Sequence, residues 1–229
     1  MGRIGNGYGS EWHLQEYLSR YRQDLDEAVV NSVGATAINW LKVPLSASGA
    51  HKEWEGLDFI QNVNVASDWK TYWPPSRPQH NWDAVATVEI GGFKEWLLVE
   101  AKAHVGEMAS QCQAKKVKSG RMIRTALEAT AKCVTYGGVP TLAWYHEHYQ
   151  YVNRLAVLNF LNNICTPAIP SRLLFIYFCG EDKMAGRVCP KSEAEWQSHL
   201  APLYRKLDIN LQSPLMQRVN SVYLPVTPG

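Results

Sequence analysis

A pair of adjacent glycines constrains the fold of this chain more than any other feature of its sequence. Gly91 and Gly92 separate two largely apolar runs, residues 83–90 and 93–102. A glycine pair between such runs is a strong signal for a two-residue β-hairpin turn, because both turn positions need a positive φ. The sequence therefore predicts two adjacent antiparallel strands joined by these glycines.

The turn also determines which residues of the two predicted strands face each other. Ile90 faces Phe93, and counting outward from this pair sets Asp83 directly across from Glu100. Facing Cβ atoms lie about 4.5–5.5 Å apart, where like charges destabilise a sheet. Two opposed carboxylates therefore need a shared proton, a cationic partner or a metal ion. Lys102 points to the same face of its strand as Glu100, so two carboxylates and an ammonium converge on one patch.

Length and composition place the chain among folded proteins. Its 229 residues suffice for one large domain, and 46% hydrophobic with 19% charged residues exclude a disordered chain. No run approaches the roughly 18 apolar residues of a membrane span, and the N-terminus lacks a signal-peptide pattern. Five cysteines without a CxxC pair favour reduced thiols and argue against a structural zinc site. We expect a cytoplasmic protein with no membrane partner, whose oligomeric state the sequence leaves open.

Positive charge is concentrated in one stretch, although the net charge of +2 is too small to indicate a nucleic-acid partner. Residues 111–127 contain no acid and five cations, namely Lys115, Lys116, Lys118, Arg121 and Arg124. A basic strip that follows soon after an acidic pocket suits a ligand with a long anionic backbone, such as DNA. The alternative is a solvated helix face.

The other segments alternate between helix and strand patterns. An apolar stripe predicts a helix from Ser10, its N-cap, to about residue 31. The remaining elements are a strand at 35–43, a loop-rich insertion at about 44–80, the hairpin, a helix at about 107–135, a helical insertion at about 141–168, a strand at 172–179, a helix at 192–207 and an edge strand at 221–225. This order predicts an α/β fold, with helices on both faces of a mixed central sheet, in a single domain spanning residues 1–229.

Glu11 lies in the first turn of the predicted N-terminal helix, on the same side as Leu14 and Leu18. A glutamate on the packed side of a helix needs a partner, because burying an unpaired charge costs several kcal/mol or shifts its pKa. We therefore regard Glu11 as a candidate site residue. The alternative is that it favours the positive end of the helix dipole.

These residues together resemble the PD-(D/E)XK nuclease superfamily. The resemblance rests on Asp83, on Glu100-Ala101-Lys102 in the next strand and on a glutamate in the preceding helix, and it covers the order of elements from about Ser10 to Cys179. It implies a restriction endonuclease-like αβββαβ core that holds the acids and the lysine on a central hairpin. The family name places a proline directly before the first acid. In this chain Asn81-Trp82 precedes Asp83 instead.

The resemblance implies a metal-dependent nuclease that hydrolyses DNA phosphodiester bonds in repair, recombination or restriction. Carboxylates are the ligands that Mg²⁺ and Mn²⁺ prefer, so Asp83 and Glu100 are the expected metal ligands. The backbone carbonyl of Ala101 adds a further ligand in this scheme. Glu11 completes the metal shell or fixes a water molecule.

Lys102 and His104 are the other expected active-site residues. Lys102 holds the attacking water and stabilises developing negative charge, but it is not expected to be the base, because two adjacent anions raise its pKa. If the strand continues, His104 points to the same side and touches substrate; the alternative is a surface histidine. The five cations of the basic strip are the expected DNA-binding residues.

Three other interpretations remain open. In the first, the chain is a nucleic-acid-binding module on the same fold that no longer cuts. In the second, it is an unrelated α/β protein whose acidic pair binds a metal ion for another reaction. In the third, Lys102 and the two acids form only a buried salt bridge.

Overall fold

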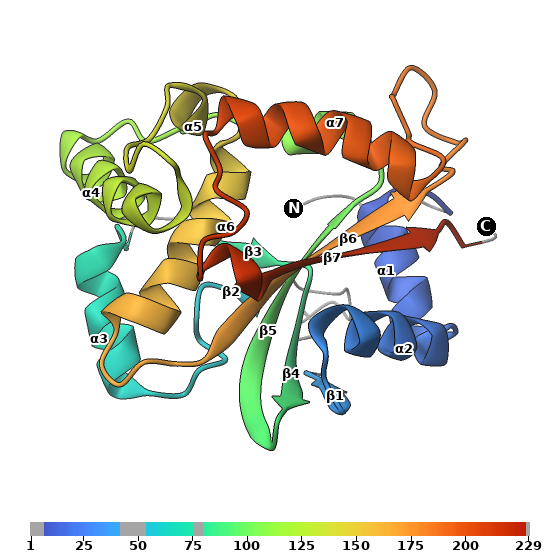
Figure 1. The fold of residues 1–229 in the computed structure, drawn as a ribbon, viewed down its shortest axis with the longest axis horizontal. Helices are drawn as coiled ribbons and strands as arrows, with labels where there is room; N and C mark the ends of the chain where they lie inside the picture. The colour runs from blue at the N-terminus through green and yellow to red at the C-terminus, as the bar shows by residue number, and fades with distance from the viewer. Residues whose placement is uncertain (1–6, 42–53, 76–79, 228–229) are drawn as a thin grey trace, which may run out of the picture.

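The computed structural model of the protein describes residues 7–41, 54–75 and 80–227 (Figure 1). Its centre is a five-stranded sheet with strand order β1-β4-β5-β6-β7. These strands are β1 (Ala37–Trp40), β4 (Ala84–Ile90), β5 (Phe93–Lys102), β6 (Ser171–Cys179) and β7 (Val219–Pro225). The first three pair antiparallel, whereas β6 runs parallel to β5 and β7 parallel to β6. The predicted α/β fold with a mixed central sheet is confirmed.

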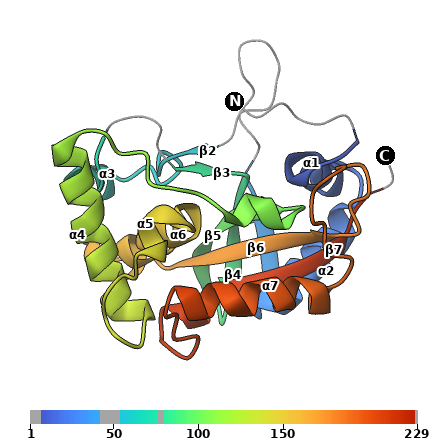
Figure 2. The same ribbon diagram turned by 90° about the horizontal axis from the view of Figure 1, so that it is seen from above.

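Helices flank the sheet, and each face of the sheet has its own apolar core. The helices are α1 (Ser10–Ser19), α2 (Arg22–Val33), α3 (Val63–Tyr72), α4 (Val117–Val134), α5 (Ala143–His146), α6 (Tyr149–Asn159) and α7 (Glu193–Lys206). α1 and α2 pack with Ala86 and Leu97, whereas α3 to α7 share a core with Val85 and Leu98. Figure 2 shows α4, α5 and α6 grouped together, away from α1 and α2. Alternate strand residues point to opposite faces, so one strand serves both cores.

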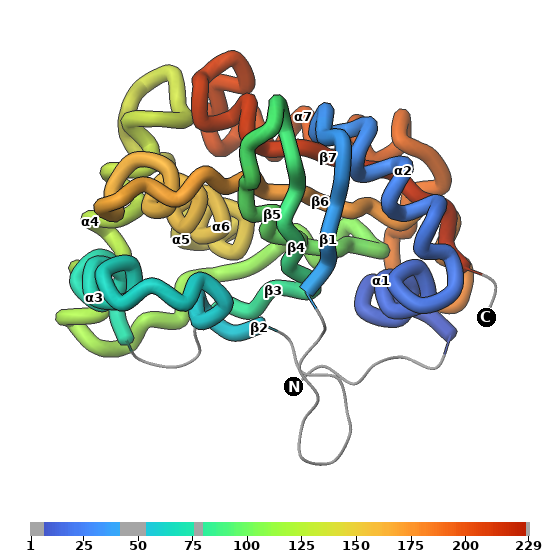
Figure 3. Tube along the Cα trace, turned by 90° about the horizontal axis from the view of Figure 1, so that it is seen from below, coloured from blue at the N-terminus to red at the C-terminus, as the bar shows by residue number. Residues whose placement is uncertain are grey.

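The smaller elements complete the described part of the chain. β2 (Trp54–Glu55) and β3 (Asn81–Trp82) form a two-stranded sheet beside the start of β4 (Figure 3). Two 3₁₀ turns, η1 (Val105–Met108) and η3 (Met216–Arg218), follow β5 and precede β7, and a π-helical turn, η2 (Phe160–Ile164), extends α6. None of the described helices is long and apolar enough to cross a lipid bilayer.

The single helix predicted from Ser10 to about residue 31 is wrong, because the chain leaves the helical conformation between α1 and α2. Tyr21 has φ −113° and ψ 36°. The Ser19 hydroxyl donates to the carbonyl of Gln15 at 2.7 Å, a side-chain bond of the kind that bends helices. α1 buries His13, Leu14 and Tyr17, whereas Glu11 is only half-buried.

The insertion predicted to be loop-rich at 44–80 contains α3. Asn62 caps this helix by accepting hydrogen bonds from the backbone N–H groups of Asn64 and Val65, and the helix buries Val65 and Trp69. A cap and apolar residues four apart are ordinary helix signals, which the breakers on both sides obscured. Residues 44–53 and 76–79 of the insertion lie outside the described residues, as do residues 42–43 of the strand predicted at 35–43.

The helix predicted at about 107–135 begins ten residues later. η1 and an extended segment precede α4, which starts at Val117. The segment is held by main-chain bonds instead of a helix: the N–H of Ser110 donates to Glu147 O at 2.7 Å, and that of Cys112 to Tyr145 O at 2.8 Å. Lys115 and Lys116 therefore lie before the helix and not on its surface.

The predicted hairpin register is confirmed. Ile90 pairs with Phe93, and the ladder continues to Ala84 opposite Val99. Gly91 and Gly92 have φ 58° and 80°, the left-handed conformation that a two-residue turn of this kind requires. The ladder positions Glu100 and Lys102 at the end of β5.

We expect the substitution Gly92→Ala to lower the free energy of unfolding by about 1–2 kcal/mol, because an L side chain at this φ meets steric strain. Gly120→Ala is the matched control, since Gly120 lies in α4 with open space at its Cβ position. It should raise stability by up to about 1 kcal/mol. Urea unfolding of both variants tests this, and equal effects would contradict the turn assignment.

Candidate functional site

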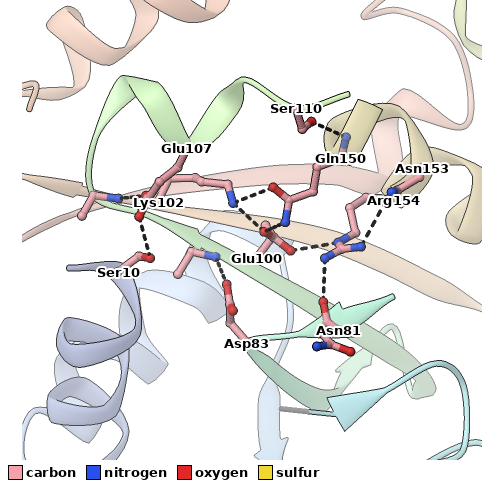
Figure 4. Close-up of polar contacts among 12 residues, drawn as sticks. Ser10, Asn81, Asp83, Glu100, Lys102, Glu107, Ser110, Gln150, Asn153 and Arg154 are labelled. Atoms are coloured by element: carbon pink, nitrogen blue, oxygen red, sulfur yellow. Dashed lines mark hydrogen bonds and ion pairs between the residues drawn. The ribbon is translucent and has the colours of Figure 1, made fainter. Parts of the chain in front are cut away.

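A buried charged network lies at the end of β5, and Glu100 is its centre (Figure 4). The Glu100 Oε1 atom accepts hydrogen bonds from Lys102 Nζ at 2.5 Å and from Gln150 Nε2 at 2.7 Å. Its other oxygen, Oε2, accepts from Arg154 Nε at 2.8 Å. The side chains of these three charged residues are at most 10% exposed. Glu100 and Lys102 thus share one face of β5, as the alternation of a strand predicts.

Arg154 is held on every side of its guanidinium. Besides Glu100, it donates to the carbonyl of Asn81 at 2.6 Å and to Asn153 Oδ1 at 3.1 Å. Its guanidinium carbon lies 4.7 Å from the centre of the Trp82 ring, a cation–π distance. Arg154 therefore joins α6 to both β3 and β5, and it orients the Glu100 carboxylate.

The two central groups of the network are both ionised at neutral pH. Burial alone would raise the pKa of Glu100, but the Arg154 and Lys102 charges outweigh it and hold that pKa below its ordinary value. Burial alone would lower the pKa of Lys102, but the carboxylates of Glu100 and Asp83 outweigh it and raise that pKa. The predicted direction of the Lys102 shift is therefore confirmed, and the group is a poor proton acceptor.

Asp83 does not sit directly across from Glu100, so that part of the prediction is wrong. The Asp83 N–H donates to Val99 O at 3.1 Å, although Val99 already pairs with Ala84. Two residues opposite one is the arrangement of a β-bulge, which ends the simple count along the ladder. The bulge turns the Asp83 carboxylate toward the backbone of β5, where Oδ2 accepts from the N–H of Ala101 at 2.7 Å. Ala101 itself is buried.

Glu107, which sequence reasoning missed, is a third carboxylate beside Lys102. Its Oε2 atom accepts from the N–H of Ala103 at 2.6 Å, and its Oε1 atom accepts from the Ser10 hydroxyl at 3.2 Å. Its charge also contributes to the raised pKa of Lys102. Glu107 thereby connects the start of α1 to the end of β5.

The place of Glu11 in the metal shell stays a prediction. Among the residues that the structure describes, no group of three or more His, Cys, Asp or Glu side chains is arranged to hold a metal ion. Glu11 follows Ser10 at the start of α1, and Ser10 contacts Glu107. The N-terminus of α1 therefore adjoins Glu107.

His104 is neither a surface residue nor part of an extended β5. The strand ends at Lys102, and His104 lies at the start of η1, where it is buried. Its Nε2 atom lies 3.7 Å from Glu107 Oε1. The predicted substrate contact depended on the alternation of side chains along β5. That strand ends at Lys102, before His104.

An open cleft of about 380 Å³ lies beside the network, and Asp83, Glu100 and Arg154 all line it. Lys102 instead lines a separate cavity of about 10 Å³, which Glu100, Gln150 and Arg154 also line. That cavity has room for about one water molecule. Asp83 and Glu100 therefore meet at the cleft, and the Lys102 ammonium contacts the Glu100 carboxylate that lines it.

Gln150 and Arg154 are the other site residues that sequence reasoning missed. They lie four residues apart in α6 and so on one face of the helix. The signal was the arginine itself, because a charge among the apolar residues of a helix needs a buried acid as partner. Only the fold identifies that acid as Glu100.

Four of the five residues of the basic strip come together in one groove. Lys115, Lys116, Arg121 and Arg124 line a groove of about 1090 Å³, together with Lys132, whereas Lys118 does not. Within the described part of the chain, none of these six cations forms an ion pair. The groove is lined by five of these cations and by one acid, Glu128, so it presents net positive charge.

A single extended segment separates the groove from the cleft. Gln111 and Gln113 line the cleft, whereas Cys112 and Ala114 line the groove. Alternate residues of an extended chain point in opposite directions, which accounts for this division. The basic groove and the acidic cleft are therefore neighbours that share one wall.

Comparisons with protein-family models, with curated proteins and with solved structures found no match for this chain.

Proposed function

We propose that this protein is a metal-dependent nuclease that hydrolyses DNA phosphodiester bonds. The observation that carries the proposal is that Asp83 and Glu100 line one open cleft, beside a cationic groove on the other side of a shared wall. The order of helix, three antiparallel strands, helix and parallel strand, with the acids and Lys102 on the central hairpin, also supports it. The cationic groove suits the anionic backbone of a nucleic acid, and the acidic cleft suits a divalent metal ion.

The donor set at the cleft suits a magnesium or manganese ion. Mg²⁺ is usually held by one or two carboxylates together with water and substrate phosphate, and Asp83 and Glu100 supply two carboxylates. A carboxylate has about four lone-pair sites, of which Glu100 uses three on Lys102, Gln150 and Arg154. When bound, the ion would acidify a water molecule and stabilise charge on the phosphoryl oxygens.

The residues of this chain have distinct roles in the proposed reaction. Asp83 and Glu100 hold the ion, and Arg154 keeps the Glu100 carboxylate in one orientation. Lys102 stays protonated, so it stabilises negative charge and does not accept the proton. Glu107 holds Ala103 at the end of β5 through the hydrogen bond from its N–H.

A cleavage assay with and without metal tests the proposal. We expect the purified protein to cut DNA in Mg²⁺ or Mn²⁺ and to lose all cutting in excess EDTA. Asp83→Asn should also abolish cutting, because the amide keeps an acceptor for the Ala101 N–H but loses the charge that binds the ion. Asp58→Asn is the control, since Asp58 is exposed and outside the cleft. Undiminished cutting by the Asp83 variant would overturn the proposal.

The groove should bind the DNA backbone. We expect Lys115→Gln with Lys116→Gln to weaken duplex binding and to reduce the salt dependence of log K by about 0.9 for each phosphate that the protein no longer neutralises. Lys94→Gln with Lys191→Gln is a matched control, because these two exposed lysines lie outside the groove. Fluorescence anisotropy over a range of salt concentrations measures both effects, and identical slopes for the two double variants would remove the groove from the proposal.

The second candidate is a nucleic-acid-binding module that does not cut. It is favoured by the engagement of both Glu100 oxygens with cations, which leaves this carboxylate neutralised without an ion. Salt-dependent DNA binding through the groove without cutting in any divalent metal would support this candidate instead.

A further inference from the structure

The cleft extends beyond the charged network, and the rest of its lining has a different chemistry. Three aromatic residues, Trp73, His80 and Tyr149, form part of the wall, and the ring centroids of Trp73 and His80 lie 4.7 Å apart. Five amide side chains also line the cleft, namely Asn81, Gln111, Gln113, Gln150 and Asn153. Metal binding and phosphate chemistry explain Asp83, Glu100 and Arg154, but they do not require this amide and aromatic lining.

The two glutamines of the shared wall are available for a ligand. Gln111 and Gln113 are exposed, and neither side chain hydrogen-bonds to a described residue. Their backbone is nevertheless held in place, because the flanking Ser110 and Cys112 N–H groups donate to carbonyls of Glu147 and Tyr145. The wall therefore presents two amide groups on a fixed backbone toward the cleft.

Two of these aromatic residues, Trp73 and His80, are uncharged and buried. His80 is 4% exposed, and its two ring nitrogens lack a hydrogen-bond partner in the described structure. Burial and the neighbouring Arg154 charge hold the pKa of His80 well below its ordinary value, so the imidazole is neutral. Trp73 is 5% exposed and stacks on Trp69 with a 6° angle between the ring planes. This region is a rigid aromatic surface next to the amides.

A nucleobase combines the two properties that this lining suits. Its faces are aromatic, and its edge carries hydrogen-bond donors and acceptors that glutamine and asparagine amides can pair with. Enzymes that take a base out of its stack hold it between aromatic or apolar side chains and hydrogen-bond its edge. The cleft volume of about 380 Å³ is that of a small-molecule site and too small for a duplex.

We propose that the cleft accepts one unstacked nucleotide of the substrate, with its base against Trp73 and His80 and its edge on Gln111 and Gln113. This inference rests on the proposed function and specifies its substrate, because an unstacked base is available in single strands, ends and unpaired regions. With the ion bound, the neighbouring phosphate would lie at Asp83 and Glu100, and the strand would continue over the wall to the cationic groove. Fully paired duplex is the poorer ligand.

The test compares three fluorescent ligands without divalent metal: a short single-stranded DNA, the same strand carrying several abasic sites, and its blunt duplex. We expect the intact single strand to bind at least about tenfold more tightly than the abasic strand and more tightly than the duplex. Gln111→Ala with Gln113→Ala should remove most of the preference for the intact strand. Gln23→Ala with Gln212→Ala is the control, because these exposed glutamines lie outside the cleft and should leave the preference unchanged.

The outcomes separate this inference from the proposed function. Equal binding of intact and abasic strands, or a preference that survives the Gln111 and Gln113 substitutions, overturns the base pocket even where Asp83-dependent cutting is observed. A preference that these substitutions remove supports the base pocket even where no metal supports cutting. Tighter binding of the duplex than of the intact single strand also overturns the inference.

Discussion

The substitution Arg154→Met is expected to lower the free energy of unfolding by about 3 kcal/mol or more, because it leaves a buried carboxylate short of a partner. The Arg154 side chain is 5% exposed and that of Glu100 3% exposed, so little solvent screens this ion pair although both residues line the cleft. Methionine keeps much of the volume of the arginine stem, which limits the cost of a cavity. Urea unfolding measures the change.

A matched control uses Glu95, a second carboxylate on β5, the strand of Glu100. Glu95 also contacts two cations, Arg172 at 2.9 Å and Arg218 at 3.0 Å, but this cluster is more exposed. Arg172→Met should therefore cost about 1 kcal/mol or less. Equal costs for Arg154→Met and Arg172→Met would contradict the role of burial.

The charge on Glu100 is the source of the expected cost, and two further measurements examine it. Adding Glu100→Gln and Lys102→Met to Arg154→Met should recover part of the lost stability, because neither a buried carboxylate nor a buried ammonium then lacks its partner. In the native protein the lowered pKa of Glu100 contributes stability that is present at neutral pH and lost as the pH falls through that pKa. The difference between native protein and Arg154→Met should therefore shrink in acid.

The substitution Lys102→Met is expected to reduce DNA cleavage by about 10²–10³-fold, the usual effect of removing one preorganised donor from a site that stabilises developing charge. Binding of DNA should change little, because the groove that holds the backbone does not include Lys102. The measurements are single-turnover cleavage in Mg²⁺ and anisotropy without metal. Circular dichroism establishes that the variant is folded, since Lys102 is also a partner of Glu100.

Lys94→Met is the control for this variant. Lys94 lies on β5 as well, at the exposed end next to the hairpin turn, and this variant should cut at the native rate. Cleavage by a folded Lys102→Met variant within about tenfold of the native rate would show that Arg154 supplies the positive charge instead. Arg154 lines the cleft directly, whereas Lys102 contacts it through Glu100.

The proposals describe one path along the surface. The cationic groove would hold the anionic backbone, the wall would offer the amides of Gln111 and Gln113, and the cleft contains the carboxylates and the aromatic residues. Each part is tested by a separate double or single variant. Binding, base preference and cutting can therefore be removed one at a time.

Local rules determined the central hairpin from the sequence alone. The conformation of Gly91 and Gly92 depends on the glycines themselves, so the turn, the ladder from Ile90–Phe93 to Ala84–Val99 and the shared face of Glu100 and Lys102 all followed by counting. The same counting failed at Asp83, because a bulge adds a residue that no periodic pattern reveals. The predicted helix boundary was also wrong at the end of α1, where the Ser19 hydroxyl donates to the carbonyl of Gln15.

The tertiary structure alone decided which distant residues complete the site. Arg154 and Gln150 reach Glu100 across about fifty positions of sequence, and Glu107 reaches Ser10 across 97. Such contacts depend on how α6 and α1 pack against the sheet, and packing is set by the whole core and not by local spacing. The candidate acids and cations could thus be identified from the sequence by residue type. Only the packing of the helices places four of the basic residues in one groove beside the cleft.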